Sequence, residues 1–146
     1  MNNVIMCVGN RDGGDDAVGP YIADKLKELK HDFVVIDCGI IPENFTADVK
    51  KYNPNVVVII DAVEMNLKPG EIRMIEGRKI SEMTVSTHGI PISVLMKYLG
   101  QYVDQVILIG IQPAQMSGNI TESVEKAANK LIELIISGKI NLIPAL

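Results

Sequence analysis

The segment Val56-Val57-Val58-Ile59-Ile60-Asp61-Ala62 does most to decide the fold of this protein. Its first five residues are apolar and β-branched, without the alternation of a half-buried strand, and this pattern is typical of a strand covered on both faces. Residues 4–8, 33–38 and 106–111 have the same character. Strands covered on both faces need helices above and below the sheet, so the sequence predicts an α/β fold.

Helical patterns lie between these strands. Val18, Ile22, Leu26 and Leu29 recur at steps of four, four and three, which predicts an amphipathic helix. We expect shorter helices over residues 45–52, ending before Pro54, and over residues 91–99. A fourth helix should begin at Thr121, a suitable N-cap residue. Its buried stripe comprises Val124, Ala128, Leu131 and Ile135.

One strand pattern departs from this alternation. Residues 71–75 read as a strand, but only a short loop with the turn dipeptide Pro69-Gly70 separates them from the strand that ends at Ala62. Parallel neighbours need a longer crossover connection, so this strand should be antiparallel in a mixed sheet. Neither a repeat nor a linker divides the sequence, and we expect one domain over residues 1–146.

Composition excludes several classes of protein. The 146 residues are 47% hydrophobic with a net charge of −4, and their basic residues form no stripe, which argues against nucleic acid. The apolar runs are shorter than the roughly twenty residues of a membrane span. Because the N-terminus has no basic leader, we expect a cytoplasmic location. We also expect a monomer. Cys7 and Cys38 lack metal or redox spacing and should be small buried hydrophobes.

Three candidate site residues belong to one rim of the predicted sheet. In open α/β sheets, ligands bind at the carboxyl ends of the strands. Asp16 follows the first strand, Asp61 lies at the end of the third, and His88 precedes the helix that starts near Pro91. Two carboxylates and one imidazole leave coordination positions open, which suits a divalent metal that also holds water or substrate.

Each of these residues also has a structural explanation. Asp16, and Asp15 even more so, could simply favour the positive end of the next helix. Asp61 could cap a turn, and His88 could be a structural histidine beside a helix start. Glycines after the first strand also invite a phosphate-loop interpretation, but Gly-x-Gly-x-x-Gly is absent and two aspartates would repel phosphate.

The motifs together resemble the hydrogenase maturation endopeptidases. They occur in the family's order and cover nearly the whole chain. They are Cys7-Val8-Gly9-Asn10, Gly14-Asp15-Asp16, Gly19-Pro20, Pro42-Glu43-Asn44, Ile60-Asp61-Ala62, Pro69-Gly70-Glu71-Ile72-Arg73, Ser86-Thr87-His88 and Gly110-Ile111-Gln112-Pro113. Two departures are Ala17, where the family usually has glycine, and Cys38, where glycine is common. Alanine predicts a helical rather than left-handed turn after Asp16.

The resemblance implies both a fold and an activity. The fold would be a three-layer α/β/α arrangement of the phosphorylase/hydrolase-like type, with a five-stranded sheet in order 2-1-3-5-4 and strand four antiparallel. The activity would be removal of the C-terminal tail from a [NiFe]-hydrogenase large-subunit precursor. Asp16, Asp61 and His88 would contact nickel that the substrate supplies, and no organic cofactor would be needed.

The sequence is compatible with two routes for cleavage of the peptide bond. The sequence has no Ser-His-Asp or Cys-His motif, which disfavours a covalent route. Either nickel polarises the scissile carbonyl or a bound water, or an aspartate acts as general base on the attacking water. Asn10 and Gln112 could bind the substrate backbone, and Glu43 could receive a basic side chain near the cut.

Two rival hypotheses belong to other classes. A phosphorelay receiver would use Asp15, Asp16 and Asp61 for magnesium and phosphoryl transfer, but it needs a lysine after its last strand, where this chain has Gln112-Pro113. The other rival is a different metal-binding or nucleotide-binding α/β module or a metal-free hydrolase, because a fold alone does not fix function.

Overall fold

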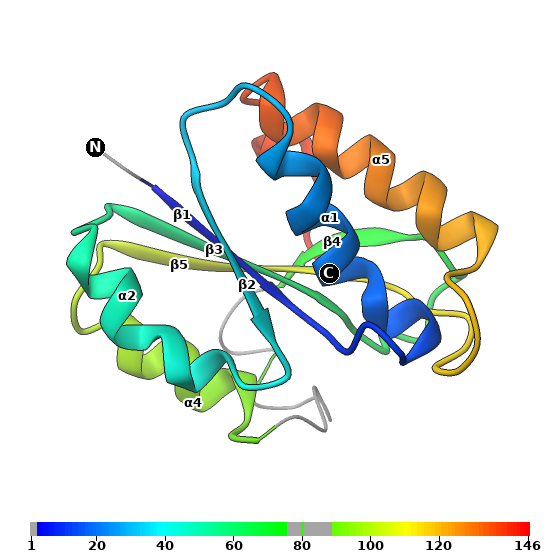
Figure 1. Ribbon diagram of the computed structural model, residues 1–146, viewed down its shortest axis with the longest axis horizontal. Coiled ribbons are helices and arrows are strands. Elements are labelled where there is room, and N and C mark those ends of the chain that lie inside the picture. The colour runs from blue at the N-terminus through cyan, green and yellow to red at the C-terminus, as the bar shows by residue number, and fades with distance from the viewer. Residues whose placement is uncertain (1–2, 76–79, 81–88) are drawn as a thin grey trace.

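The computed structural model describes residues 3–75, 80 and 89–146 and is built around one mixed sheet (Figure 1). The strands of this sheet in the described residues are β1 (Val4–Val8), β2 (Val34–Gly39), β3 (Val56–Ala62), β4 (Ile72–Ile75) and β5 (Gln105–Ile111). They lie in the order β2-β1-β3-β5-β4. β4 is antiparallel to β5, and the other neighbours are parallel, so the predicted mixed sheet is confirmed.

Helices cover both faces of the sheet. The α-helices are α1 (Val18–Lys27), α2 (Thr46–Lys51), α4 (Ile92–Leu99) and α5 (Glu122–Ile136), and the short 3-10 helices are η1 (Gly14–Ala17), η2 (Pro42–Phe45) and η3 (Ile140–Leu142). In Figure 1, α1 and α5 cover one face and α2 and α4 the other. The predicted three-layer α/β/α fold is therefore confirmed.

The central strands show why the sheet is buried on both sides. Along β1, Ile5 and Cys7 join the core with α1 and α5, whereas Val4, Met6 and Val8 join the core with α2 and α4. All five are fully buried. Successive side chains of a strand point to opposite faces, so an uninterrupted apolar run supplies both cores at once.

Element boundaries differ little from those that the sequence predicts, with one exception. The helical stripe was expected to reach Leu29, but α1 ends at Lys27 and Leu29 is 45% exposed. The His31 Nε2–H donates a hydrogen bond to the Leu26 carbonyl at 2.7 Å, and its Nδ1 accepts from the Phe33 N–H, so the chain leaves the helix before another turn can form. Cys7 and Cys38 are free and buried as predicted, and they belong to opposite core layers.

Within the part of the chain that the structure describes, no helix has both the length and the apolar character needed to cross a membrane. The expectation of a single domain over residues 1–146 stays a prediction.

Candidate functional site

The candidate site lies where β1, β2, β3 and β5 end, which we call the carboxyl rim. These strands are parallel, so their carboxyl ends share one edge of the sheet. η1 follows β1 directly and also contacts β3. This contact brings the turn that carries Asp16 against the strand that carries Asp61.

Asp16 is held in a tightly packed turn. Its side chain is only 4% exposed, and its Oδ2 accepts a hydrogen bond from the Asn10 backbone N–H at 3.0 Å. A Cβ on Gly9 would lie 1.9 Å from the Asp16 carbonyl oxygen, so the two loop segments approach more closely than any side chain allows. Ala17 adopts φ −76° and ψ 0°, which confirms the predicted non-left-handed turn.

Asp61 is fully buried near the end of β3. In the sheet it lies opposite Gly110 of β5. Since Val57 and Ile59 belong to the core with α2 and α4, the alternation of the strand directs Asp61 to that same face. This buried carboxylate lies at the carboxyl end of its strand, where ligands bind in open α/β sheets, so Asp61 is a candidate site residue.

The third predicted site residue, His88, lies outside the described residues. α4 begins at Ile92, shortly after His88 in the chain, and covers the face toward which Asp61 points. Across residues 3–75, 80 and 89–146, no three His, Cys, Asp or Glu side chains form a group that could hold a metal ion. The trio of Asp16, Asp61 and His88 therefore stays a prediction.

Asp15 has a role that the sequence did not reveal. Its fully buried carboxylate accepts hydrogen bonds from the backbone N–H groups of Ala114 (2.7 Å), Gln115 (3.1 Å) and Thr121 (2.7 Å), and the Thr121 hydroxyl donates to it as well, at 3.0 Å from each oxygen. Burial acts to raise the pKa of this carboxyl, but the amide donors outweigh it and the pKa is lowered. Asp15 thus binds the backbone at the start of α5, whereas the sequence predicted that it would favour the start of α1, the next α-helix in the chain.

Gln112 also makes contacts that the sequence did not reveal. Its side-chain oxygen accepts from the N–H groups of Met65 (2.7 Å) and Leu67 (3.2 Å), and its amide nitrogen donates to Glu64 Oε2 (2.8 Å) and the Pro113 carbonyl (3.2 Å). The side chain is 3% exposed. These hydrogen bonds hold the loop after β3 in place, and the predicted contact of Gln112 with a substrate backbone stays a prediction.

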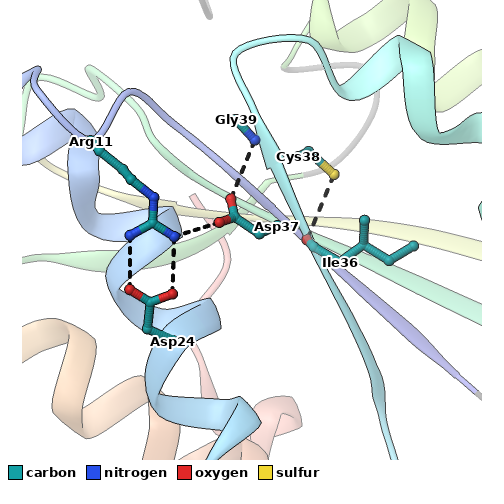
Figure 2. Close-up of polar contacts among 6 residues, drawn as sticks. All are labelled: Arg11, Asp24, Ile36, Asp37, Cys38 and Gly39. Carbon is teal, nitrogen blue, oxygen red and sulfur yellow. Dashed lines mark hydrogen bonds and ion pairs between the residues drawn. The ribbon is translucent and has the colours of Figure 1, made fainter.

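Arg11 joins the first loop to β2 and α1 at the same rim. Figure 2 shows its guanidinium between two carboxylates, with hydrogen bonds to Asp24 at 2.8 and 2.9 Å and a further one to Asp37. These contacts lower the pKa of Asp24 and raise that of Arg11. Asn10 Oδ1 accepts from the Asp12 N–H at 2.9 Å, so Asn10 fits the turn role that its type suggests.

A cleft of about 520 Å³ opens beside this ion pair. It is lined by the backbone of the first loop, by Asp37 and by an apolar ledge that includes Ile40, Ile41 and Phe45. Ile40 and Ile41 are 47% and 42% exposed, unusually open for their size. The cleft therefore combines an exposed apolar ledge with the charged Arg11 and Asp37.

Glu43 lies beside the residue that follows His88. A Cβ on Gly89 would lie 2.3 Å from Glu43 Oε2, so the carboxylate packs directly against the Gly89 backbone. This contact places the Pro42-Glu43-Asn44 motif next to Gly89, where the described part of the chain resumes. The predicted role of Glu43 as a receptor for a basic side chain stays a prediction.

Comparison with known proteins agrees with this geometry. A family model described as hydrogenase maturation protease matches residues 20–138. The Hydrogenase 3 maturation protease of Escherichia coli strain K12 is 42% identical over 115 residues, which cover 77% of this chain and 74% of that protein.

Solved structures give the same result. The endopeptidase HycI from Escherichia coli superposes with a TM-score of 0.93 at 34% identity, covering 100% of this chain and 97% of that one. A [NiFe] hydrogenase maturation protease, HycI from Thermococcus kodakarensis, gives a TM-score of 0.85 at 31% identity, covering 94% and 92%.

The layered fold, the acidic carboxyl rim and these matches define an α/β peptidase. The chain belongs to the hydrogenase maturation protease family. This membership decides against the phosphorelay receiver and the other rival modules.

Proposed function

We propose that this protein removes the C-terminal tail of a nickel-loaded [NiFe]-hydrogenase large-subunit precursor, and that Asp16, Asp61 and His88 contact the nickel of that substrate. The observation that carries the proposal is the pair of buried carboxylates at one rim, on two elements that touch. Family membership supplies the class of reaction, and the relatives, which include a [NiFe] hydrogenase maturation protease, support the kind of substrate.

The two carboxylates and the imidazole of the proposed trio are suitable ligands for nickel. Carboxylate oxygen and imidazole nitrogen are ligands that bind borderline divalent ions such as nickel, and two or three protein ligands leave positions for ligands from the substrate. Nickel would then arrive on the precursor. A precursor without nickel would lack the bond that fixes its tail in register for cleavage.

Peptide hydrolysis at this rim needs an activated water. In the step that we propose, the water oxygen bonds to the scissile carbonyl carbon, one water proton passes to a carboxylate of the pair, and the C–N bond breaks as its nitrogen takes up that proton. Nickel in the precursor would polarise the water or the carbonyl if it also acts as a Lewis acid. Asp61→Asn separates the two roles, because loss of a base lowers kcat whereas loss of a metal contact alone raises KM.

The cellular setting follows from the same substrate. We propose that the protein acts as a monomer in the cytoplasm, where the precursor is assembled. Cell fractionation and light scattering of the purified protein test these two points. A periplasmic location or a stable dimer would contradict them.

A cleavage assay with an internal control tests the function. Purified protein is mixed with nickel-loaded precursor, and the mass of the large subunit is followed. We expect loss of one C-terminal fragment, unchanged with Asp12→Asn and abolished with Asp16→Asn. Asp12 is an exposed aspartate of the same loop. Both variants remove one negative charge, so a difference between them shows that the buried position of Asp16 matters and not the net charge. Equal activity of the two variants, or no cleavage with the unaltered protein, would contradict the proposal.

A metal titration tests the site without the substrate. Cadmium or zinc should perturb the His88 ring resonances, and His88→Ala should weaken the binding isotherm. Resonances that do not move would make the trio structural. We also expect no tightly held nickel in the purified protein, since the metal belongs to the substrate, and nickel in stoichiometric amount after chelation would contradict this.

A further inference from the structure

The contacts of Asp15 join two segments of the rim that are far apart in sequence. Its carboxylate takes the N–H groups of Ala114, Gln115 and Thr121, and its own N–H donates to the Gln115 carbonyl at 2.9 Å. Gly14 packs equally closely, because a Cβ there would lie 2.5 Å from the Ser117 nitrogen. We call residues 112–121 the β5–α5 loop. Residues 114–119 are exposed, yet three backbone N–H groups of the loop donate to this one buried carboxylate.

The arrangement is more than a helix cap. Thr121 is the N-cap residue of α5 and could cap the helix with its own hydroxyl, as the sequence predicts, but its side chain makes no cap hydrogen bond. The hydroxyl donates to Asp15 instead. A cap by the Thr121 hydroxyl would not require burial of a charged group. Binding by the Asp15 carboxylate does require it, and it makes the start of α5 depend on the position of η1.

Asp16 belongs to the same short turn as Asp15. Asp15 and Asp16 are consecutive in η1, a 3-10 turn of four residues, and Asp16 N–H donates to the Gly13 carbonyl at 3.1 Å. The Asn10 N–H then reaches the Asp16 carboxylate. A rotation of the turn that freed Asp15 would therefore also displace the Asp16 carboxylate.

We infer that Asp15 is the positioning residue of this site: it fixes the direction of the Asp16 carboxylate and locks the β5–α5 loop beside it as one preformed surface for the precursor. The inference rests on the proposed function for the role of Asp16, but the mechanical coupling that it states does not. The partner of the surface is the polypeptide on either side of the scissile bond, which would meet the exposed Met116 of the loop.

Amide hydrogen exchange of the free protein tests the coupling. In Asp15→Asn one carboxylate oxygen becomes a donor, so acceptor bonds to the loop are lost while size is kept. We expect exchange at Ala114, Gln115 and Thr121, and also at Asn10, to accelerate by about tenfold or more, since bonds to a charged acceptor are lost. Ile135→Val, at the far end of α5 and 3% exposed, is the control for general destabilisation.

The distribution of the change decides the result. Acceleration at Asn10 in Asp15→Asn, and not in Ile135→Val, supports the inference. Acceleration confined to the β5–α5 loop and α5 overturns it, because Asp15 would then be a cap alone. If Asp15→Asn does not fold, Thr121→Val, which removes one hydroxyl donor and no charge, gives the same comparison with the same two outcomes.

Kinetics separate this inference from the proposed function. With nickel-loaded precursor, Asp15→Asn should lower kcat/KM by about tenfold or more at a temperature where both variants are folded, and Ile135→Val should not. Equal kcat/KM in Asp15→Asn and the unaltered protein overturns the positioning role. No cleavage by the unaltered protein refutes the proposed function, and the exchange result still decides the coupling.

Discussion

At the residue scale, the site depends on close packing as much as on its charges. Gly9 and Gly39 show the difference, because both have positive φ, of 154° and 55°. At Gly9 a Cβ would lie 1.9 Å from the Asp16 carbonyl, whereas at Gly39 it would meet nothing within 4 Å. Gly9 thus allows the close approach of the Asp16 backbone, whereas Gly39 is needed only for its positive φ.

A matched pair of alanine substitutions tests this distinction. Gly9→Ala should lower the free energy of unfolding by roughly 3 kcal/mol or more, because the backbone of η1 has to move. Gly39→Ala should cost about 1 kcal/mol, the strain of a left-handed alanine. Urea denaturation measures both. Equal losses would mean that the contact between Gly9 and Asp16 is not tight.

The two cysteines should be inert in the folded protein. Burial raises the pKa of the Cys38 thiol to about 12 and raises that of Cys7 as well. The reactive species is the thiolate, which is scarce at pH 8 when the pKa lies above that value. Iodoacetamide at pH 8 should therefore label neither thiol until urea is added. Rapid labelling of native protein would place a cysteine in solvent and contradict the structure.

At the element scale, the sequence predicts the parts and misses how they are joined. Residues 4–8 and 56–62 were predicted with their observed bounds, because an uninterrupted apolar run can only be a covered strand here. The antiparallel β4 followed from the short Pro69-Gly70 connection. The order of the strands came from the family resemblance, since local patterns do not say which strands are neighbours.

The site was predictable only in part, for a physical reason. The position of Asp16 and Asp61 at one rim could be predicted, because the carboxyl ends of parallel strands converge there. The partners of Asp15 and Gln112 could not, because most of them are backbone N–H groups of distant loops, and a backbone N–H has no sequence signature. The Gly14-Asp15-Asp16 motif was a signal, and the sequence favoured Asp15 as the structural aspartate, but it pointed to the helix that follows Asp15 instead of the start of α5.

The turn after Asp16 offers a test at this scale. Ala17 has φ −76°, an angle that alanine adopts freely, so glycine brings no structural advantage here. Ala17→Gly should lower the free energy of unfolding by about 0.5–1 kcal/mol, through the greater freedom of the unfolded chain, and should leave cleavage unchanged. A gain in stability would show that the turn is strained.

At the scale of the whole molecule, the sheet has two edges with different surroundings. β2 forms one edge and β4 the other. The edge of β4 is covered by residues 143–146: Met74 donates to the Pro144 carbonyl at 2.9 Å, and Leu146 donates to the Met74 carbonyl at 3.0 Å. Ile143 is 6% exposed in the core beside α5. An edge covered in this way cannot pair with another chain.

Removal of residues 143–146 should therefore have two effects. Loss of the buried Ile143 should lower the free energy of unfolding by about 2 kcal/mol or more. The exposed edge of β4 should promote self-association, visible by light scattering. Ile143→Ala in the full chain is the control, because it removes the core contact and keeps the edge covered. Scattering that rises equally in both proteins would contradict the role of the edge.

We propose that the protein recognises nickel bound to its substrate. The most direct test compares cleavage of one precursor with and without the metal. Hydrogenase large-subunit precursor from the same cells is prepared in nickel-loaded and nickel-free form, and mass spectrometry follows its C-terminus with the unaltered protein, Asp16→Asn and His88→Ala. We predict loss of a single C-terminal fragment only with nickel and only with the unaltered protein. Equal cleavage of both forms, or full activity in either variant, would contradict the account.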